Sequence, residues 1–219
     1  KDLMINLNYK TNNILILISI ISLFYILFTN VYFSVSDSFI FGAADGLSFL
    51  KIANASPNIS TEIIQPIHSE RFIVSYLIGI LSKLFFLENY EVFRYISILS
   101  ILILNYLIFK ILFLFNISFN NKIFAVLLIN LNPYVTRFYI SNPLMINDLI
   151  FHIGVLISIL SITTKNKKLF YSGLIISIIA RQSGVAVFIA VFFVKIIMND
   201  KFFLDKKDIF YSFILITVL

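Results

Sequence analysis

Two carboxylates follow a long apolar run near the start of the chain. The stretch SVSDSFIFGAADGLSFLKIA, residues 34–53, contains Asp37, Asp45 and one balancing cation, Lys51. A carboxylate beside apolar walls can hold its pKa near the working pH and act as a general base. We assign this candidate role to Asp37, for which the alternative is a solvated loop aspartate. Asp45 is a candidate substrate-binding residue, for which the favoured alternative is a charge at a helix N-terminus, where the helix macrodipole stabilises it.

A second group of polar residues, HSER at positions 68–71, precedes an apolar segment. His68 and Arg71 are three positions apart and would share one face of a helix. Arg71 would then contact a phosphate, with His68 as a second donor. The alternative is an interfacial polar cluster that anchors residues 71–87. We interpret His152, a lone histidine in an apolar helix, and Arg94 as structural.

Polar residues also interrupt the apolar runs later in the chain. Arg181 and Gln182, both candidate substrate-binding residues, follow a short apolar segment, and an arginine there needs an anionic partner. It either reaches lipid headgroups or clamps the phosphate or pyrophosphate of a lipid carrier. Asn142 and Asp148 flank Pro143 at a predicted helix turn. They are either helix caps or residues that hold a cation or orient a substrate.

The composition indicates what kind of protein carries these groups. Hydrophobic residues make up 60% and charged residues 13% of 219 residues, with a mean hydropathy of +0.98. Soluble domains have about 45–50% apolar and about 25% charged residues, so we predict an integral membrane protein. Without cysteine, disulfides and thiolate metal sites are excluded. The net charge of +6 suits cytoplasmic loops at anionic lipid better than a nucleic-acid partner.

The apolar runs and the lysines predict a topology. Lys1 and Lys10 precede the first span, 14–33, so the positive-inside rule places the N-terminus in the cytoplasm. Residues 34–91 then form an outer loop with a short amphipathic helix at 44–55. Segment 71–87 lies along the surface or re-enters, because the later lysine-rich loops then all face the cytoplasm. The further spans are expected at 92–115, 122–140, 149–163, 169–180 and 185–198. Pro133 marks a kink or an end within the second of these. A cytoplasmic loop at 199–208 and a new helix from 209 follow.

This order of elements predicts an all-α, polytopic transmembrane helix bundle in one domain, 1–219, placed in the inner (plasma) membrane. The run from 209 is still apolar at Leu219, so we expect the chain to continue. No nucleotide-binding, zinc-protease or serine-hydrolase signature is present.

Five segments in this order resemble the GT-C membrane glycosyltransferases of the protein-mannosyltransferase-like and aminoarabinose-transferase-like branch. They are SVSDSFIFGAADG, QPIHSERFIVSYLIGILSKLF, VFRYISILSILILNYLIFKILF, SNPLMINDLIF and LFYSGLIISIIARQSGVAVF. The resemblance implies a sugar donor on a polyprenyl phosphate, a lipid, glycan or protein acceptor, Asp37 as the base and Arg181 at the donor phosphate. Relatives often have Asp at the position of Asn142, so a divalent cation there would depend on Asp148.

Two other functions remain open from the sequence. A transporter or flippase for a lipid-linked glycan would place charged groups at the membrane midplane within broken, repeat-related helices. The polar residues here fall at the outer boundary and no repeat is visible, which favours an enzyme. A non-catalytic membrane subunit of envelope glycan assembly is the third alternative.

Overall fold

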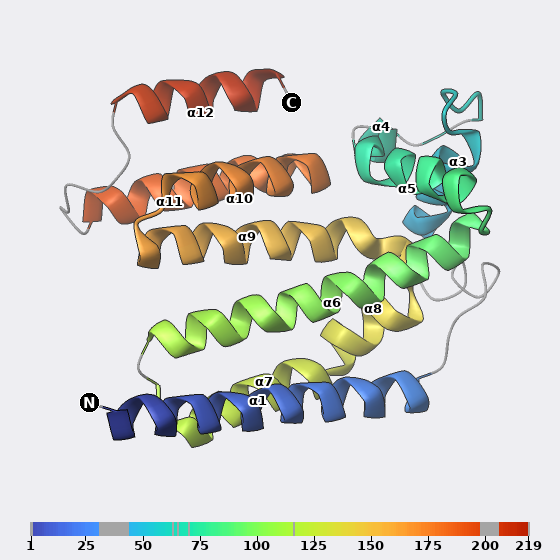
Figure 1. Cartoon of the computed structure of the whole chain (residues 1–219). Coiled ribbons are helices and arrows are strands. Elements are labelled where there is room, and N and C mark those ends of the chain that lie inside the picture. Colours follow the sequence, from blue (N-terminus) through green and yellow to red (C-terminus); the bar gives the residue numbers. More distant parts are fainter. Residues whose placement is uncertain are drawn as a thin grey trace.

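The computed structural model describes residues 2–30, 44–62, 64, 66–69, 71–115, 117–197 and 206–218, and all regular structure among them is helical. The all-α prediction is therefore confirmed. The long helices run side by side (Figure 1): α1 (Asp2–Thr29), α6 (Asn89–Leu114), α7 (Phe119–Leu131), α9 (Ile146–Thr164), α10 (Lys167–Ala180), α11 (Val185–Ile197) and α12 (Lys206–Val218). The remaining elements are α3 (Ala44–Ala55), α4 (Pro66–Ser69), α5 (Phe72–Phe85), the π-helical turn Pro133–Arg137, α8 (Phe138–Ser141) and the 3₁₀ turns Pro143–Met145 and Gln182–Gly184.

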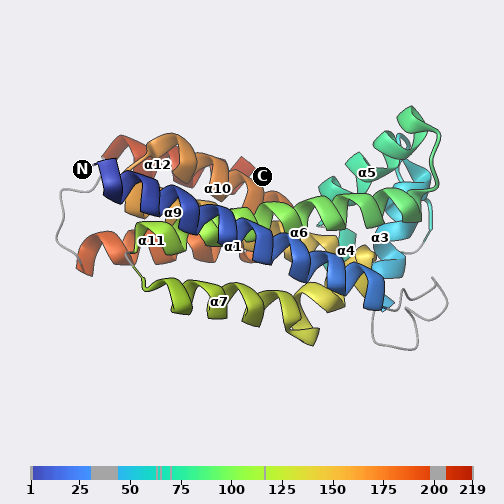
Figure 2. The same cartoon turned by 60° about the horizontal axis from the view of Figure 1, so that its bottom comes forward.

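Helices α3, α4 and α5 gather at one end of the bundle, here called the α5 end (Figures 1 and 2). Helix α1 ends and α6 begins there, so these two helices are antiparallel although α5 separates them in the sequence. Helix α5 therefore does not run the length of the bundle. This is the arrangement that a surface or re-entrant position of 71–87 requires; its relation to a membrane stays a prediction.

The opposite end of the bundle, here called the lysine end, holds the end of α6, the start of α7 and the α9–α10 turn (Figure 1). Lysines are placed at or near these helix ends: Lys110, Lys122, Lys165, Lys167, Lys168 and Lys207. The α5 end instead carries both signs of charge, with Lys51 of α3 and Lys83 of α5 as well as acidic residues such as Glu62 and Asp148.

Several helices begin before the apolar spans that the sequence predicts, while α1 and α7 end before their predicted ends at 33 and 140. The first helix begins at Asp2 rather than residue 14, and α12 begins at Lys206, inside the stretch predicted as loop 199–208. Helix α10 begins two residues early because the Asn166 side chain caps it, accepting from the amides of Lys168 (3.0 Å) and Leu169 (3.4 Å). The length of an apolar run gives too short a helix when polar residues form the first turns or the N-cap.

Other elements follow the sequence closely. The amphipathic helix predicted at 44–55 is α3, with the same bounds. Helix α7 ends at Leu131, just before Pro133, which lacks the N–H that a continuing helix needs. Helix α5 lies within the predicted 71–87, and α6 and α9 begin three residues earlier than expected.

Small residues let α9 and α10 approach closely. A Cβ on Gly154 would lie 2.7 Å from the Ser177 nitrogen and 2.8 Å from the Gly173 oxygen. A Cβ on Gly173 would lie 2.8 Å from both the Gly154 oxygen and the Ser158 nitrogen. Each helix thus presents Gly-x-x-x-Ser to the other, the small-xxx-small pattern of tightly packed helices. This contact fixes the end of α10 against the start of α9.

The α5 end is joined to the bundle by an apolar cluster. Phe49 of α3, Ile78 of α5 and Phe93 of α6 pack with Leu144 of the 3₁₀ turn before α9. Leu144 is fully buried, and its side chain lies against Gly46 of α3. The turn that leads into α9 is therefore held by both α3 and α6.

Helix α1 packs against α7, which follows it by about a hundred residues of chain. The buried Asn130 of α7 donates to the Ser22 hydroxyl at 2.7 Å. Beyond α7, Asn30 Nδ2 donates to the Ser141 hydroxyl of α8 at 2.9 Å, and Arg137 of the π-helical turn donates to the Thr29 hydroxyl at 3.1 Å.

Among the residues that the structure describes, two helical stretches are long and apolar enough to cross a membrane, Asn89–Leu114 with a mean hydropathy of 2.3 and Pro143–Thr164 with 2.0. Only 39% and 44% of their most apolar windows are buried inside the molecule. Large apolar side chains elsewhere are also exposed, among them Phe28 at 83% and Phe86 at 95%. The bundle therefore presents apolar side chains outward as well as inward.

Candidate functional site

The antiparallel contact of α9 and α10 brings two sequence-predicted site residues together at the α5 end. Asp148 lies in the first turn of α9, and Arg181 directly follows α10. Arg181 Nη1 lies 2.9 Å from Asp148 Oδ1, and the side chains are 32% and 21% exposed. The guanidinium carbon also lies 5.9 Å from the centre of the Phe151 ring. The ion pair is thus partly shielded from solvent and strengthened by a cation–π contact.

Arg181 keeps hydrogen-bonding capacity beyond this ion pair. A guanidinium has five N–H donors. Its Nε is buried and has no hydrogen-bond partner among the residues that the structure describes. Such a buried, unsatisfied donor costs about 1–3 kcal/mol, so an anionic ligand that accepted from it would gain by removing that cost.

Two buried asparagines lie on the turn that leads into α9. Asn142 is 1% exposed, and neither its Oδ1 nor its Nδ2 has a partner within the described part of the chain. It makes no side-chain cap, so the cap alternative for Asn142 is wrong. Asn147, also 1% exposed, donates to the Arg71 carbonyl at 3.4 Å, while its Oδ1 has no partner in the same part. The turn therefore buries amide groups whose hydrogen bonds are incomplete.

Asn147 is not among the residues predicted from the sequence. The only signal was an amide next to Asp148 at the start of an apolar helix, and that pattern is common at helix starts. Its role depends on where Arg71 lies, which the sequence does not reveal.

His68 and Arg71 do not share a helix face, contrary to the prediction. Helix α4 ends at Ser69, and Arg71 lies between α4 and α5. His68 is 3% exposed; its Nδ1 lies 3.2 Å from the Ser48 hydroxyl, and its ring lies 5.5 Å from that of Phe49. His68 thus packs against α3, while the backbone of Arg71 contacts α9 through Asn147.

The remaining predicted residues are placed as follows. Gln182 is exposed in the 3₁₀ turn next to Arg181. Asp45 is the second residue of α3, as expected for a charge at a helix start. Asp37 lies in 31–43, outside the described residues, as does the side chain of Asp45.

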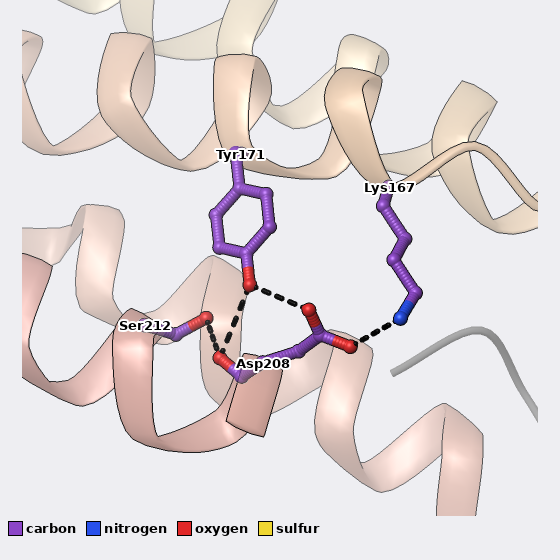
Figure 3. A network of polar contacts seen from close by, with 4 residues as sticks. All are labelled: Lys167, Tyr171, Asp208 and Ser212. Atoms are coloured by element: carbon purple, nitrogen blue, oxygen red, sulfur yellow. Dashed lines mark hydrogen bonds and ion pairs between the residues drawn. The ribbon is translucent and has the colours of Figure 1, made fainter. Parts of the chain in front are cut away.

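A second polar network, which the sequence analysis also missed, lies toward the lysine end (Figure 3). Asp208 of α12 accepts from Lys167 Nζ at 2.7 Å and from the Tyr171 hydroxyl at 2.8 Å, and Ser212 donates to its carbonyl at 2.8 Å. The Asp208 side chain is 11% exposed, and both carboxylate oxygens have partners. This network attaches α12 to α10. Both carboxylate oxygens of Asp208 accept hydrogen bonds within it, whereas the buried asparagines at the α5 end have amide atoms left unpaired by the described residues.

No group of three or more His, Asp or Glu side chains suited to a metal ion occurs in the described part of the chain. The Asp148–Arg181 pair places a guanidinium, a group that binds anions, at the α5 end. Comparison of the chain with family models, with curated proteins and with solved structures gives no match.

Proposed function

We propose that this protein is an integral membrane glycosyltransferase that moves a sugar from a polyprenyl-phosphate donor to a hydroxyl of a lipid, glycan or protein acceptor. The reaction takes place at the outer face of the plasma membrane, with the N-terminus in the cytoplasm. The observation that carries the proposal is the Asp148–Arg181 pair at the α5 end, which leaves a buried guanidinium donor unused.

Three features support the membrane location. The most apolar windows of the two longest apolar stretches are less than half buried, so most of their side chains need an apolar surrounding. The α9–α10 contact uses Gly and Ser to bring backbones together, which is how helices associate where lipid removes the hydrophobic driving force. Lysines at one end of the bundle fit the cytoplasmic side under the positive-inside rule.

The phosphate role of Arg181 rests on geometry and charge. A guanidinium binds phosphate oxygens through paired N–H groups, and Asp148 holds that guanidinium in place from one side. Asn142 Nδ2 supplies a further buried donor on the adjoining turn. These groups lie at an end of the bundle and not halfway along it, which favours a transferase over a transporter.

The reaction follows from these roles. The Asp37 carboxylate takes the proton of the acceptor hydroxyl, and the resulting nucleophilic oxygen attacks the anomeric carbon of the sugar. The bond between that carbon and the phosphate oxygen breaks, the configuration inverts, and polyprenyl phosphate leaves. Since the phosphate gains negative charge as the bond breaks, Arg181 stabilises the transition state more than the bound donor.

The test uses the protein in lipid nanodiscs with polyprenyl phosphates that carry radiolabelled hexoses or pentoses, and a crude envelope-lipid extract as the acceptor. We expect Asp37→Asn to lower the transfer rate by about 10²–10⁴-fold, the usual contribution of a general base. Glu91→Gln, which changes an exposed carboxylate in the first turn of α6, is the control and should retain transfer. The proposal is refuted by wild-type protein that transfers none of the sugars, or by Asp37→Asn with wild-type activity.

A further inference from the structure

A cleft of about 410 Å³ lies at the α5 end, between α3, α5 and the segment that joins them. Its volume falls within the range of small-molecule sites, about 300–1,000 Å³. Five of its lining side chains have polar tips: Asn58, Ser60, Glu62, Ser69 and Tyr76. The rest of its described wall is apolar: Ile52, Ile59, Ile64 and Phe72. Neither Asp148 nor Arg181 is among these lining residues, so the cleft is a separate place from the candidate site.

The segment that closes the cleft is fixed at its start and near its end. The Tyr76 hydroxyl of α5 donates to the Pro57 carbonyl at 2.8 Å, and the Ser56 hydroxyl donates to the Tyr76 carbonyl at 3.0 Å. Further along, Lys51 Nζ of α3 lies 3.0 Å from Glu62 Oε2. These contacts shape the cleft before a ligand arrives, which lowers the entropy that binding must spend on ordering the site.

The charges of the cleft exclude several ligand classes. Glu62 is the one charged side chain among the described lining residues, so a phosphate or carboxylate ligand would be repelled. A cationic ligand would have to displace Lys51, which already neutralises Glu62. A hydrocarbon chain would remove water from the polar tips without replacing their hydrogen bonds. The ligand that remains is a neutral molecule with both hydroxyl groups and an apolar face.

Two aromatic rings supply a surface for such an apolar face. Phe72 and Tyr76 are one turn apart on α5, with 6.2 Å between ring centres and 76° between ring planes. Phe72 is 47% exposed, so its ring is open to a ligand. The face of an aromatic ring carries partial negative charge and attracts polarised C–H groups. A sugar ring presents C–H groups on its face and hydroxyls around its edge.

We propose that this cleft binds a neutral sugar, with the sugar ring stacked on Phe72 and its hydroxyls hydrogen-bonded to Asn58 and Glu62. The amide both donates and accepts, and the carboxylate accepts. The inference goes beyond the proposed transfer reaction, because the cleft binds the sugar whether or not the protein moves one. Arg71, the residue before Phe72, accepts from Asn147 at its carbonyl at 3.4 Å. The cleft thus adjoins the candidate site without sharing its charges.

The first experiment needs no variant. Wild-type protein in nanodiscs is mixed in turn with neutral hexoses, pentoses and N-acetylhexosamines, and binding is followed by saturation-transfer difference NMR with empty nanodiscs as the blank. We expect at least one sugar to receive saturation, most strongly at the C–H protons of one ring face. The phosphate ester of that sugar should bind at least about threefold more weakly, because Glu62 repels it.

Two results of this experiment would overturn the proposal. One is the absence of saturation for every sugar, which leaves the transfer reaction to be judged by its own assay. The other is a sugar phosphate that binds more tightly than the sugar through a contact that Arg181→Ala removes. That result would place the sugar at the candidate site and not in the cleft.

The second experiment compares matched variants of exposed residues. Phe72→Leu removes the proposed stacking ring, and Phe85→Leu removes an exposed ring at the other end of α5, outside the cleft. We expect Phe72→Leu to weaken sugar binding by about threefold to tenfold and Phe85→Leu to bind as wild type.

A second pair tests the carboxylate. Glu62→Ala should weaken binding by about tenfold or more, since it removes the acceptor for the sugar hydroxyls, whereas Glu88→Ala changes an exposed carboxylate outside the cleft and should have no effect. Circular dichroism checks that each variant is folded. Equal binding within either pair of folded variants overturns the assignment of the sugar to this cleft and leaves the proposed function standing.

Discussion

The contact between α9 and α10 makes a specific prediction for Gly173→Ala. The new Cβ would lie 2.8 Å from the Gly154 oxygen and 2.8 Å from the Ser158 nitrogen, both of them backbone atoms that cannot rotate away. The helices must therefore separate. Alanine gains about 1 kcal/mol over glycine in helix propensity, while overpacking costs about 1–3 kcal/mol. Because the clash is with backbone on the facing helix, we expect the cost to exceed the gain, for a net loss of up to about 2 kcal/mol.

The assay is reversible unfolding in mixed micelles by added sodium dodecyl sulfate, followed by circular dichroism. Ser172→Ala is the matched control, since Ser172 is exposed on the same helix beside Gly173. It gains helix propensity without a clash, so its stability should equal or slightly exceed that of the wild type. If Gly173→Ala is as stable as Ser172→Ala, the backbones of α9 and α10 do not approach as described and the reasoning fails.

Two further predictions concern the start of α10 and its contact with α12. Asp208→Asn removes the ion pair with Lys167 and keeps an acceptor for Tyr171. We expect the free energy of unfolding in the same assay to fall by only about 1 kcal/mol, because Lys167 is partly exposed. In Lys167→Met protein the same aspartate change should cost less, and an equal cost in both backgrounds contradicts the ion pair. Asn166→Ala removes the cap of α10 and should also cost about 1 kcal/mol, whereas Asn166→Asp should restore most of it; unchanged unfolding of the alanine variant would mean that the cap is not formed.

The elements that the sequence predicted well are those with a local cause. Helix α3 has its predicted bounds, because apolar residues recur at helical spacing between turn-forming segments. Pro133 ends α7 for a reason confined to one residue. The starts of α1 and α12 were not predicted, because both helices begin with polar residues that precede the apolar run.

For the candidate site, the sequence identified residues but not their partners. Asp148 and Arg181 were chosen separately, and their pairing depends on α9 and α10 being antiparallel neighbours joined by a short turn. The contact of Asn147 with Arg71 joins positions 76 residues apart, and no local pattern encodes it. The expectation that His68 and Arg71 share a face failed because α4 ends between them. The role of Asp37 stays a prediction.

The contact between α1 and α7 has a consequence for biosynthesis. Ser22 and Thr29 of α1 hydrogen-bond with Asn130 and Arg137, each pair separated by 108 positions in the chain. At about 5–20 residues per second, a ribosome completes α1 roughly 5–20 s before these partners exist. During that interval the hydroxyls of α1 satisfy themselves locally, as Ser22 and Thr29 do by donating to the carbonyls of Ser19 and Tyr25. These hydroxyls of the first helix therefore have acceptors within the helix before Asn130 and Arg137 are synthesised.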